Sequence, residues 1–461
     1  MTVIKDKDEG PEEPSGATLN QDLPYANPSP EVSTAEVSTA EVSPPEVLTT
    51  SFEVVGSLRE YTRALGGRLK AGESGMLPVI AALILIAVVF QVETSKYLSA
   101  INIVNILAYA SIYVLLGMAE TFALLLSEID LSIAEVGFVG AMVMTELMTY
   151  PNNWPWWLAV IVAMLVCAAI GALQGTLITR LRIPSFVVTL GGYLGWYGFL
   201  IFVTDLDKSA LGGVLQIPSS NPIWGIVNKQ MSPTAGWIVL VAAVAVFGVY
   251  IWARDARRRA QKLSAPPRSI TVLIIVAVTA LGVLVVWICN VNRGIVGVPQ
   301  RGVPYFVPVV VVIVAAWTIV FGRTRFGRYV YAIGANPEAA RRAGINVARI
   351  RTAAFAMGSL TAAFAGILYA SRQGSMSITV TAGSFTLLGV AAAVIGGTSL
   401  FGGRGKPSYA VIGGITVASL YFGLYLLGVS ADGTYMAIAV MLVAAAAVDT
   451  LVRRRRLTSA V

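Results

Sequence analysis

Residues 334–346 read Gly-Ala-Asn-Pro-Glu-Ala-Ala-Arg-Arg-Ala-Gly-Ile-Asn, and this short polar stretch lies between two apolar runs of membrane length. Its beginning has the composition of a helix start. Asn336 suits an N-cap position, and Pro337 suits the first helical turn, where its missing N–H has no partner to lose. Glu338 follows in the first turn, where the helix dipole favours a negative charge. A helix is therefore predicted to begin at this point.

The other end of the stretch has the signals of a helix stop. Arg341 and Arg342 fall near the carboxyl end, and Gly344 can end the helix in a left-handed conformation. The pattern predicts a compact cytoplasmic helix at about residues 335–345, inside a membrane protein and able to press on another protein.

Composition indicates a membrane protein. Of its 461 residues 56% are hydrophobic and 13% are charged, whereas soluble domains are about half apolar and about a quarter charged. Histidine is absent, which excludes histidine acid–base catalysis, catalytic triads and histidine metal sites. We expect no cofactor, no metal site and no catalytic residue on this chain.

Twelve apolar segments follow the amino-terminal region, and most approach the roughly 20 residues that a helix needs to cross a bilayer. Because the backbone in hydrocarbon must satisfy its own hydrogen bonds, these segments are predicted to be helices. The expected fold is an all-α transmembrane bundle of about twelve spans. The segments lie near 76–92, 101–126, 130–150, 156–179, 183–203, 236–253, 270–290, 304–322, 350–371, 384–400, 408–428 and 434–452.

Charge along the chain predicts its orientation and its domains. Basic residues gather in alternate loops, which places both termini in the cytoplasm of a multi-pass cell-membrane protein. Residues 1–70 form an acidic, Pro- and Ser/Thr-rich cytoplasmic tail that we predict to be disordered, although a partner-docking role stays open. The transmembrane domain is expected at 71–456, followed by a short cytoplasmic tail at 457–461.

One glycine-rich stretch has some features of a phosphate-binding loop. Residues 402–408 read Gly-Gly-Arg-Gly-Lys-Pro-Ser, but Leu400 stands where the motif needs its first glycine, and Pro407 stands where it needs Ser or Thr. The stretch is better interpreted as a tight turn. If ATP drives this protein, another subunit must bind it.

Four stretches carry a resemblance to a known family. They are Ser127–Ile133 (SEIDLSI), Ile183–Gly192 (IPSFVVTLGG), Phe326–Val347 (FGRYVYAIGANPEAARRAGINV) and Ala391–Gly403 (AAAVIGGTSLFGG). Over about residues 76–456 the chain resembles the branched-permease family of ABC carbohydrate importers. The resemblance is strongest to xylose-type members, which also carry an additional helical pair around a basic loop, here Ala253–Arg268.

The resemblance implies a permease subunit that is not itself an enzyme and that imports a monosaccharide, D-xylose or a related pentose. It implies two copies of an ABC ATPase subunit, a second permease copy in a homodimer, an extracytoplasmic sugar-binding protein and surrounding lipid, and no nucleic acid. The helix at 335–345 resembles the loop that couples such permeases to the ATPase. The expected coupling residues are Asn336, Pro337, Glu338, Ala339, Ala340, Arg341, Arg342 and Gly344.

The stretch Ser127–Glu135 is unusually acidic for a membrane border, and two interpretations stay open. Ser132 and Glu135 have the spacing of a capping box, and Asp130 can also hold free backbone N–H groups. Alternatively, Glu128, Asp130 and Ser132 lie at a broken helix end that faces the substrate route, where carboxylates accept hydrogen bonds from sugar hydroxyls.

The segment near 183–203 supplies further candidates for the translocation pathway, namely Phe186, Thr189 and Trp196. The aromatic side chains could stack on a sugar ring, but packing or an interfacial belt is the favoured interpretation. The family also often has an acidic pair before Ala391, whereas this chain has Thr386 and Leu388. No carboxylate role is therefore expected there.

An ion- or proton-coupled secondary transporter is the alternative function. It would act alone and would pair buried acids with bases inside the membrane. The acids between residues 120 and 135 fit loosely, but the polar helix at 335–345 would then have no purpose. Copurification of an ATPase would separate the two hypotheses.

Overall fold

The computed structural model describes residues 76–149, 152–206, 214–261, 265–294, 298–377 and 382–458. The predicted disordered tail at 1–70 lies outside these residues. So does the end of the carboxyl-terminal tail, from residue 459.

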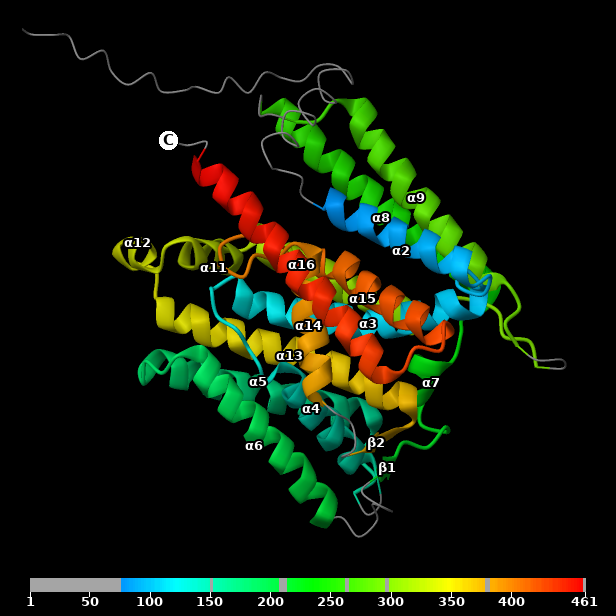
Figure 1. Ribbon diagram of the computed structural model, residues 1–461, viewed down its shortest axis with the longest axis horizontal. Helices are drawn as coiled ribbons and strands as arrows, with labels where there is room; N and C mark the ends of the chain where they lie inside the picture. The colour runs from blue at the N-terminus through cyan, green and yellow to red at the C-terminus, as the bar shows by residue number, and fades with distance from the viewer. Residues whose placement is uncertain are drawn as a thin grey trace, which may run out of the picture. The chain divides into compact units, whose positions relative to one another are not determined.

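The described chain is almost entirely helical (Figure 1). Its elements are α2 (Leu77–Glu93), α3 (Ala100–Leu124), α4 (Ile133–Met148), α5 (Trp156–Arg180), α6 (Ser185–Leu206), β1 (Val214–Gln216), α7 (Pro222–Asn228), α8 (Pro233–Ala260), α9 (Arg268–Asn290), α10 (Phe306–Arg323), α11 (Arg325–Ala335), α12 (Pro337–Arg342), α13 (Val347–Gln373), β2 (Ser375–Ser377), α14 (Ala382–Gly396), α15 (Tyr409–Leu426) and α16 (Ala431–Thr458).

Each of the twelve apolar segments predicted from the sequence coincides with one long helix, which confirms the all-α membrane bundle. Local signals set many of the ends. The Ser99 side chain accepts a hydrogen bond from Asn102 N at the start of α3, and Gly374, at φ 69°, ends α13 in the left-handed conformation. The sequence missed the helices α7 and α11 and the two strands, because their amphipathic or turn-rich segments are too short to show a period.

Length and hydropathy qualify eight of the described helices to cross a membrane, namely α3, α5, α6, α8, α9, α10, α13 and α15. Helices α2, α14 and α16 contain shorter apolar stretches. At 17 residues α2 is about 26 Å long, somewhat less than the roughly 30 Å hydrocarbon core. The count of about twelve spans therefore stays a prediction.

Helix α3 lies at the centre of the bundle, where it packs against α13, α14 and α15. Small residues allow this close packing. A Cβ atom at Gly366 would overlap the carbonyl oxygen of Gly137, and one at Gly413 would overlap that of Ala392. Glycine at these two positions therefore allows the helix backbones to approach closely. The outer helices α8 and α9 are mostly exposed, as expected for surfaces that face lipid.

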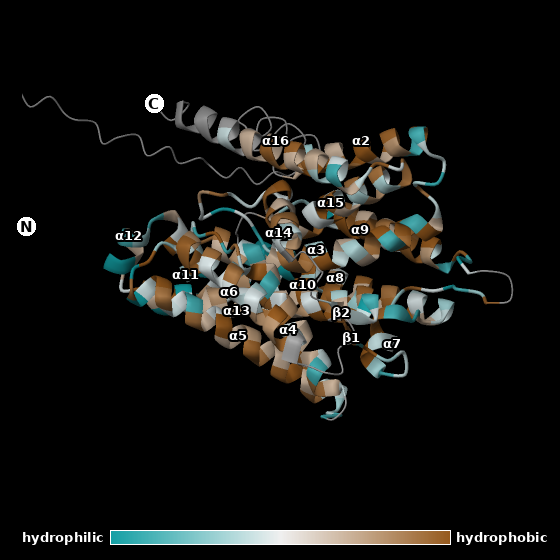
Figure 2. Cartoon of the chain, turned by 60° about the horizontal axis from the view of Figure 1, so that its bottom comes forward, coloured by the Kyte–Doolittle hydropathy of each residue, from teal (hydrophilic) through white to brown (hydrophobic). Residues whose placement is uncertain are grey.

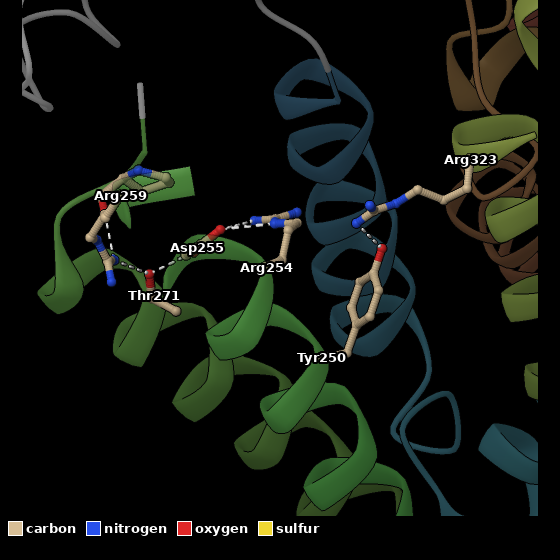
Figure 3. Close-up of polar contacts among 7 residues, drawn as sticks. Tyr250, Arg254, Asp255, Arg259, Thr271 and Arg323 are labelled. Carbon is tan, nitrogen blue, oxygen red and sulfur yellow. Dashed lines mark hydrogen bonds and ion pairs between the residues drawn. The ribbon is translucent and has the colours of Figure 1, made fainter. Parts of the chain in front are cut away.

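The helical pair predicted around the basic loop is present as α8 and α9, which pack against each other. Near the end that the two helices share, the Asp255 side chain is buried, with 1% of its surface exposed. Arg254 Nη2 lies 2.8 Å from Asp255 Oδ1, and Thr271 Oγ1 donates a hydrogen bond to Asp255 Oδ2 at 2.8 Å (Figure 3). Arg323 of α10 donates to the Tyr250 hydroxyl at 2.9 Å, which links the pair to the rest of the bundle (Figure 3). The only acid of this loop is thus neutralised within the pair.

At the other end of the bundle, two short strands join distant loops. Strand β1 follows α6, strand β2 follows α13, and they pair antiparallel with Leu215 opposite Met376. Both of these side chains are buried in the main hydrophobic core. The pairing ties the ends of α6 and α13 together on the side away from α12.

Candidate functional site

Helix α12 has the ends that its sequence predicted. Asn336 Oδ1 accepts hydrogen bonds from the backbone N–H groups of Glu338 at 3.1 Å and Ala339 at 3.0 Å. Pro337 occupies the first turn, and Gly344 follows with φ 82°. The N-cap and the left-handed stop are both confirmed.

The surface of α12 is polar and almost wholly exposed (Figure 2). Glu338 lies 3.4 Å from both Arg341 and Arg342, in side-chain pairs that are more than half exposed. Such pairs contribute little to stability, so their value lies in the charge pattern that they present. Ala340 alone is buried, and it packs in a cluster with Leu125 and Ile333. The helix therefore rests on the protein through one small side chain.

Helix α11 holds α12 against the end of α3. Gly334 of α11 lies so close to the Leu125 carbonyl that a Cβ atom would overlap its oxygen. The same carbonyl accepts a hydrogen bond from Gly403 N at 2.9 Å. Ser127 Oγ donates to Phe401 O at 2.9 Å, so two loops and α11 meet at the end of α3.

The glycine-rich stretch at 402–408 is part of this junction and is a turn, as interpreted from its sequence. Gly402, Gly403 and Gly405 all have positive φ angles, which side chains other than glycine rarely adopt. The Tyr331 hydroxyl of α11 donates to Gly405 O at 2.8 Å. Burial raises the pKa of Tyr331 to about 12, so this phenol keeps its proton and its hydrogen bond at neutral pH.

Next to the junction, a polar network surrounds the loop between α3 and α4. The Asp130 side chain accepts hydrogen bonds from Ser132 N at 3.0 Å and Ser132 Oγ at 2.7 Å. Ser132 Oγ also accepts from Gln174 Nε2 of α5 at 2.8 Å, and Glu120 of α3 accepts from Asp130 N at 3.3 Å. All four side chains are almost completely buried.

The same network continues into α4 and α14. Ala134 N donates to Thr386 Oγ1 at 3.2 Å, and this hydroxyl donates to Glu135 Oε2 at 3.0 Å. The capping box predicted for Ser132 and Glu135 is wrong, because Ser132 makes no side-chain cap bond. Asp130 and Thr386 hold the free N–H groups at the start of α4 instead, and for Asp130 this role was predicted.

Part of this network lacks partners. Among the described residues, Glu120 Oε2, Glu135 Oε1 and Gln174 Oε1 are buried without a hydrogen bond, and none of these carboxylates forms an ion pair with a described base. Buried polar atoms are normally satisfied. These oxygens are therefore buried acceptors whose hydrogen-bonding capacity is not used by the described residues.

The structure brings together some of the pathway residues predicted from the sequence and separates others. Asp130 and Ser132 bond directly, and Thr189 of α6 donates to Ile129 O at 3.2 Å beside them. Phe186 is 55% exposed on the surface of α6. Trp196 packs against the hydrophobic core and edge-on to Phe199, so neither aromatic side chain belongs to the polar network.

Glu128 lies on the other side of the same loop and forms an ion pair with Arg351 of α13 at 3.3 Å. A cavity of about 570 Å³ opens beside this pair, between the α5–α6 loop and the α12–α13 connection. Arg182 and Arg341 also line it. The acidic loop, the loop before α6 and the predicted coupling helix therefore face one cavity.

Sequence reasoning missed Gln174 and the partner roles of Thr386 and Arg351. A lone amide inside the apolar run 156–179 was a usable signal for Gln174, because an unpaired amide is costly in hydrocarbon. The pairing with Thr386 needed the fold, since 251 positions separate it from Glu135.

The described residues offer no group of three or more His, Cys, Asp or Glu side chains that could hold a metal ion. Cys167 and Cys289 are buried free thiols on the separate helices α5 and α9.

Comparison with known proteins identifies the family. The family model described as "Branched-chain amino acid transport system / permease component" matches residues 102–446. The xylose transport system permease protein of Escherichia coli strain K12 is 34% identical over 391 residues, which are 84% of this chain and 94% of that protein. The corresponding protein of Haemophilus influenzae is 34% identical over 388 residues, 81% of this chain and 96% of the relative.

A more distant relative is named for a different sugar. The ribose import permease protein of Escherichia coli strain K12 is 28% identical over 391 residues, 84% of this chain and 98% of that protein. No solved structure matches the chain significantly. The family match and the long apolar helices show that the chain belongs to the branched-chain amino acid transport system permease family and is a multi-pass membrane protein.

Proposed function

We propose that this chain is the transmembrane permease subunit of an ATP-driven ABC importer that moves a monosaccharide, D-xylose or a related pentose. The observation that carries the proposal is α12, an exposed, capped polar helix that is packed onto the end of the central helix of a permease. The relatives named for xylose support D-xylose as the substrate. Because another relative is named for ribose, the transport assay must also include other sugars.

The contacts around α12 support a route for mechanical coupling. A push on α12 passes through Ala340 into the cluster that holds Leu125, and through Gly334 onto the Leu125 carbonyl. Leu125 follows α3 directly and precedes the loop that carries Asp130. Because close-packed interiors transmit displacement instead of absorbing it, movement of α12 should shift this loop and its polar network.

The polar network is the proposed translocation element. Asp130, Ser132 and Thr189 adjoin the buried oxygens that have no partner, and Glu128 faces the neighbouring cavity. Sugar hydroxyls can donate to such acceptors. Phe186 and Trp196 are assigned to contact with lipid and to packing, respectively.

The energy source and the partners follow from the same proposal. ATP is hydrolysed by two copies of a separate ABC ATPase subunit that receives α12, including Asn336, Pro337, Ala339 and Arg342. A second, identical permease copy completes the pathway, and an extracytoplasmic sugar-binding protein delivers the sugar. The acidic tail at 1–70 and the last residues, 457–461, lie in the cytoplasm with α12.

Reconstitution tests the proposal directly. The chain, its ATPase and its binding protein are placed in proteoliposomes, and uptake of radiolabelled D-xylose, D-ribose and L-arabinose is measured with and without ATP. Uptake that needs ATP and the ATPase supports the proposal. Uptake by the chain alone, driven by an ion gradient and abolished by an ionophore, would instead establish the secondary transporter, which the buried Glu120 and Glu135 would then serve.

A further inference from the structure

A second cavity lies at the opposite end of α3 from α12. It has a volume of about 310 Å³ and lies between the start of α3, α7, the α9–α10 loop and the end of α13. We call it the α7 cavity. Its polar and aromatic lining consists of Asn105, Trp224, Asn228, Gln230, Arg293, Gln300, Phe306 and Arg372.

The position of the α7 cavity places it across the membrane from α12. Helix α3 has 25 residues and is about 37 Å long, more than the roughly 30 Å hydrocarbon core. Ile101 and Ala108, in the first turns of α3, line the cavity, whereas Leu125, just past the other end, packs on α11 and α12. Figure 1 shows α7 and α12 on opposite sides of the bundle.

The cavity has a fixed framework. Asn228 Nδ2 donates to Ser371 O at 2.7 Å, and Arg372 Nη1 donates to Asn228 Oδ1 at 3.1 Å. The Arg293 guanidinium donates to the carbonyl groups of Cys289, Val291 and Gly302. Both cations are therefore held by neutral acceptors, and none of the described residues that line the cavity is a carboxylate.

Three accessible amides point to a polar ligand in this cavity. Among the described residues, the side chains of Asn105, Gln230 and Gln300 have no hydrogen-bond partner, although all three line the same cavity. Asn105 and Gln230 are half-buried, and Gln300 is exposed at the rim. Their convergence on one space, next to the indole of Trp224, is the pattern of a small-molecule site with a few placed polar groups.

The chemistry of the lining selects the ligand. A primary amide both donates and accepts, so several amides together suit hydroxyl groups, which also do both. An indole offers an apolar face to a ring, and the volume is near the lower end of the roughly 300–1,000 Å³ range of small-molecule sites. We propose that the α7 cavity binds a neutral monosaccharide on the side of the membrane opposite α12, before translocation.

This proposal rests on the proposed function for its substrate class, but its test does not require transport. The full chain is purified alone in detergent, and binding of D-xylose is measured by saturation-transfer difference NMR. Asn105→Leu and Gln230→Leu keep nearly the same side-chain size and remove the amide. Each lost hydrogen bond should weaken binding about five- to tenfold.

The matched control is Gln373→Leu. Gln373 is an exposed amide next to Arg372 on α13 and does not line the cavity, so this variant should bind D-xylose like the unaltered chain. Thermal unfolding of all three variants checks that each is folded. Unchanged binding in both cavity variants, or equal weakening in the control, would overturn the α7 cavity as a sugar site.

Two further measurements separate the alternatives. D-Xylonate, the anion of the same carbon skeleton, measures how strongly Arg293 and Arg372 select charge, and binding of D-xylonate without binding of D-xylose would overturn the neutral ligand class. In the reconstituted importer, normal ATP-driven uptake together with unchanged binding in both cavity variants would overturn the cavity and leave the proposed function intact. Sugar binding to the chain without ATP-driven uptake of any monosaccharide would refute the proposed function and support the cavity.

Discussion

Replacing Gly334 by alanine should break the junction between α11 and the end of α3. The added Cβ would overlap the Leu125 carbonyl oxygen and lie 2.7 Å from Gly403 N. Both are backbone atoms, so no side-chain rotation can relieve the contact. Helix α11 must move away, and α12 must move with it because the two are joined at Asn336.

The size of the effect follows from the contacts that are lost. Overpacking of a close-packed site costs about 1–3 kcal/mol. Loss of the 2.9 Å bond from Gly403 N to Leu125 O and of the 2.8 Å bond from Tyr331 to Gly405 O adds about 1 kcal/mol each. The total is about 3–5 kcal/mol. At roughly 1 °C per kcal/mol for a chain of several hundred residues, Tm should fall by about 3–5 °C.

The assay combines stability with transport. The variant should insert into the membrane, unfold at a lower temperature in detergent and lose most ATP-driven uptake, because α12 no longer bears on Leu125. The matched control is Gly322→Ala, at a helical position in α10 where an added Cβ meets nothing within 4 Å, which should leave both readouts unchanged or raise Tm slightly. If Gly334→Ala keeps the unaltered Tm and uptake, the proposed transmission through Leu125 is wrong.

Three other predictions address α12, the orientation and the tail. Glu338→Arg removes both ion pairs of α12 and reverses its first-turn charge, so uptake should be lost while the amount of protein in the membrane stays normal; uptake at the unaltered rate would contradict the coupling role. A cysteine at position 338, where the native side chain is 58% exposed, should react with a membrane-impermeant maleimide only after the cells are permeabilised. The two native thiols add little background because both are buried. Labelling in intact cells would show that α12 lies outside the cell and that the predicted orientation is wrong. A chain that starts near Gly56 keeps the bases Arg59, Arg63, Arg68 and Lys70 and should insert and transport normally, whereas a transport defect at normal abundance would show that the acidic tail docks a partner.

The sequence predicted the helices well because the signals for them are local. A long apolar run must be a helix in hydrocarbon, so all twelve predicted segments could be placed without knowledge of their neighbours. The same holds for α12, since Asn336, Pro337 and Gly344 act on backbone groups only a few residues away. Span boundaries and the span count depend on tertiary packing as well, because hydropathy alone does not determine how a 15- or 16-residue helix such as α14 or α4 lies in the bilayer.

The candidate site was predicted only in part. The acidic motif drew attention to Asp130 and Ser132 from its composition, and Asp130 does hold the start of α4. The capping box failed because Ser132 has nearer partners in Asp130 and Gln174, the second of which lies on another helix. Phe186 and Trp196 share a segment with Thr189, but the rotation of α6 in the bundle turns only Thr189 toward the network.

The sequence by itself therefore determined the membrane class, the helical segments, the capped polar helix and the family resemblance, all of which depend on neighbouring residues or on motifs within one segment. Tertiary structure alone decided which residues meet across the bundle. Thr386 reaches Glu135 over 251 positions, Gly334 meets Leu125, and Asn105 shares the α7 cavity with Gln300. The physical reason is that helix rotation and crossing are set by the packing of small residues between helices, and no single helix carries that information in its own period.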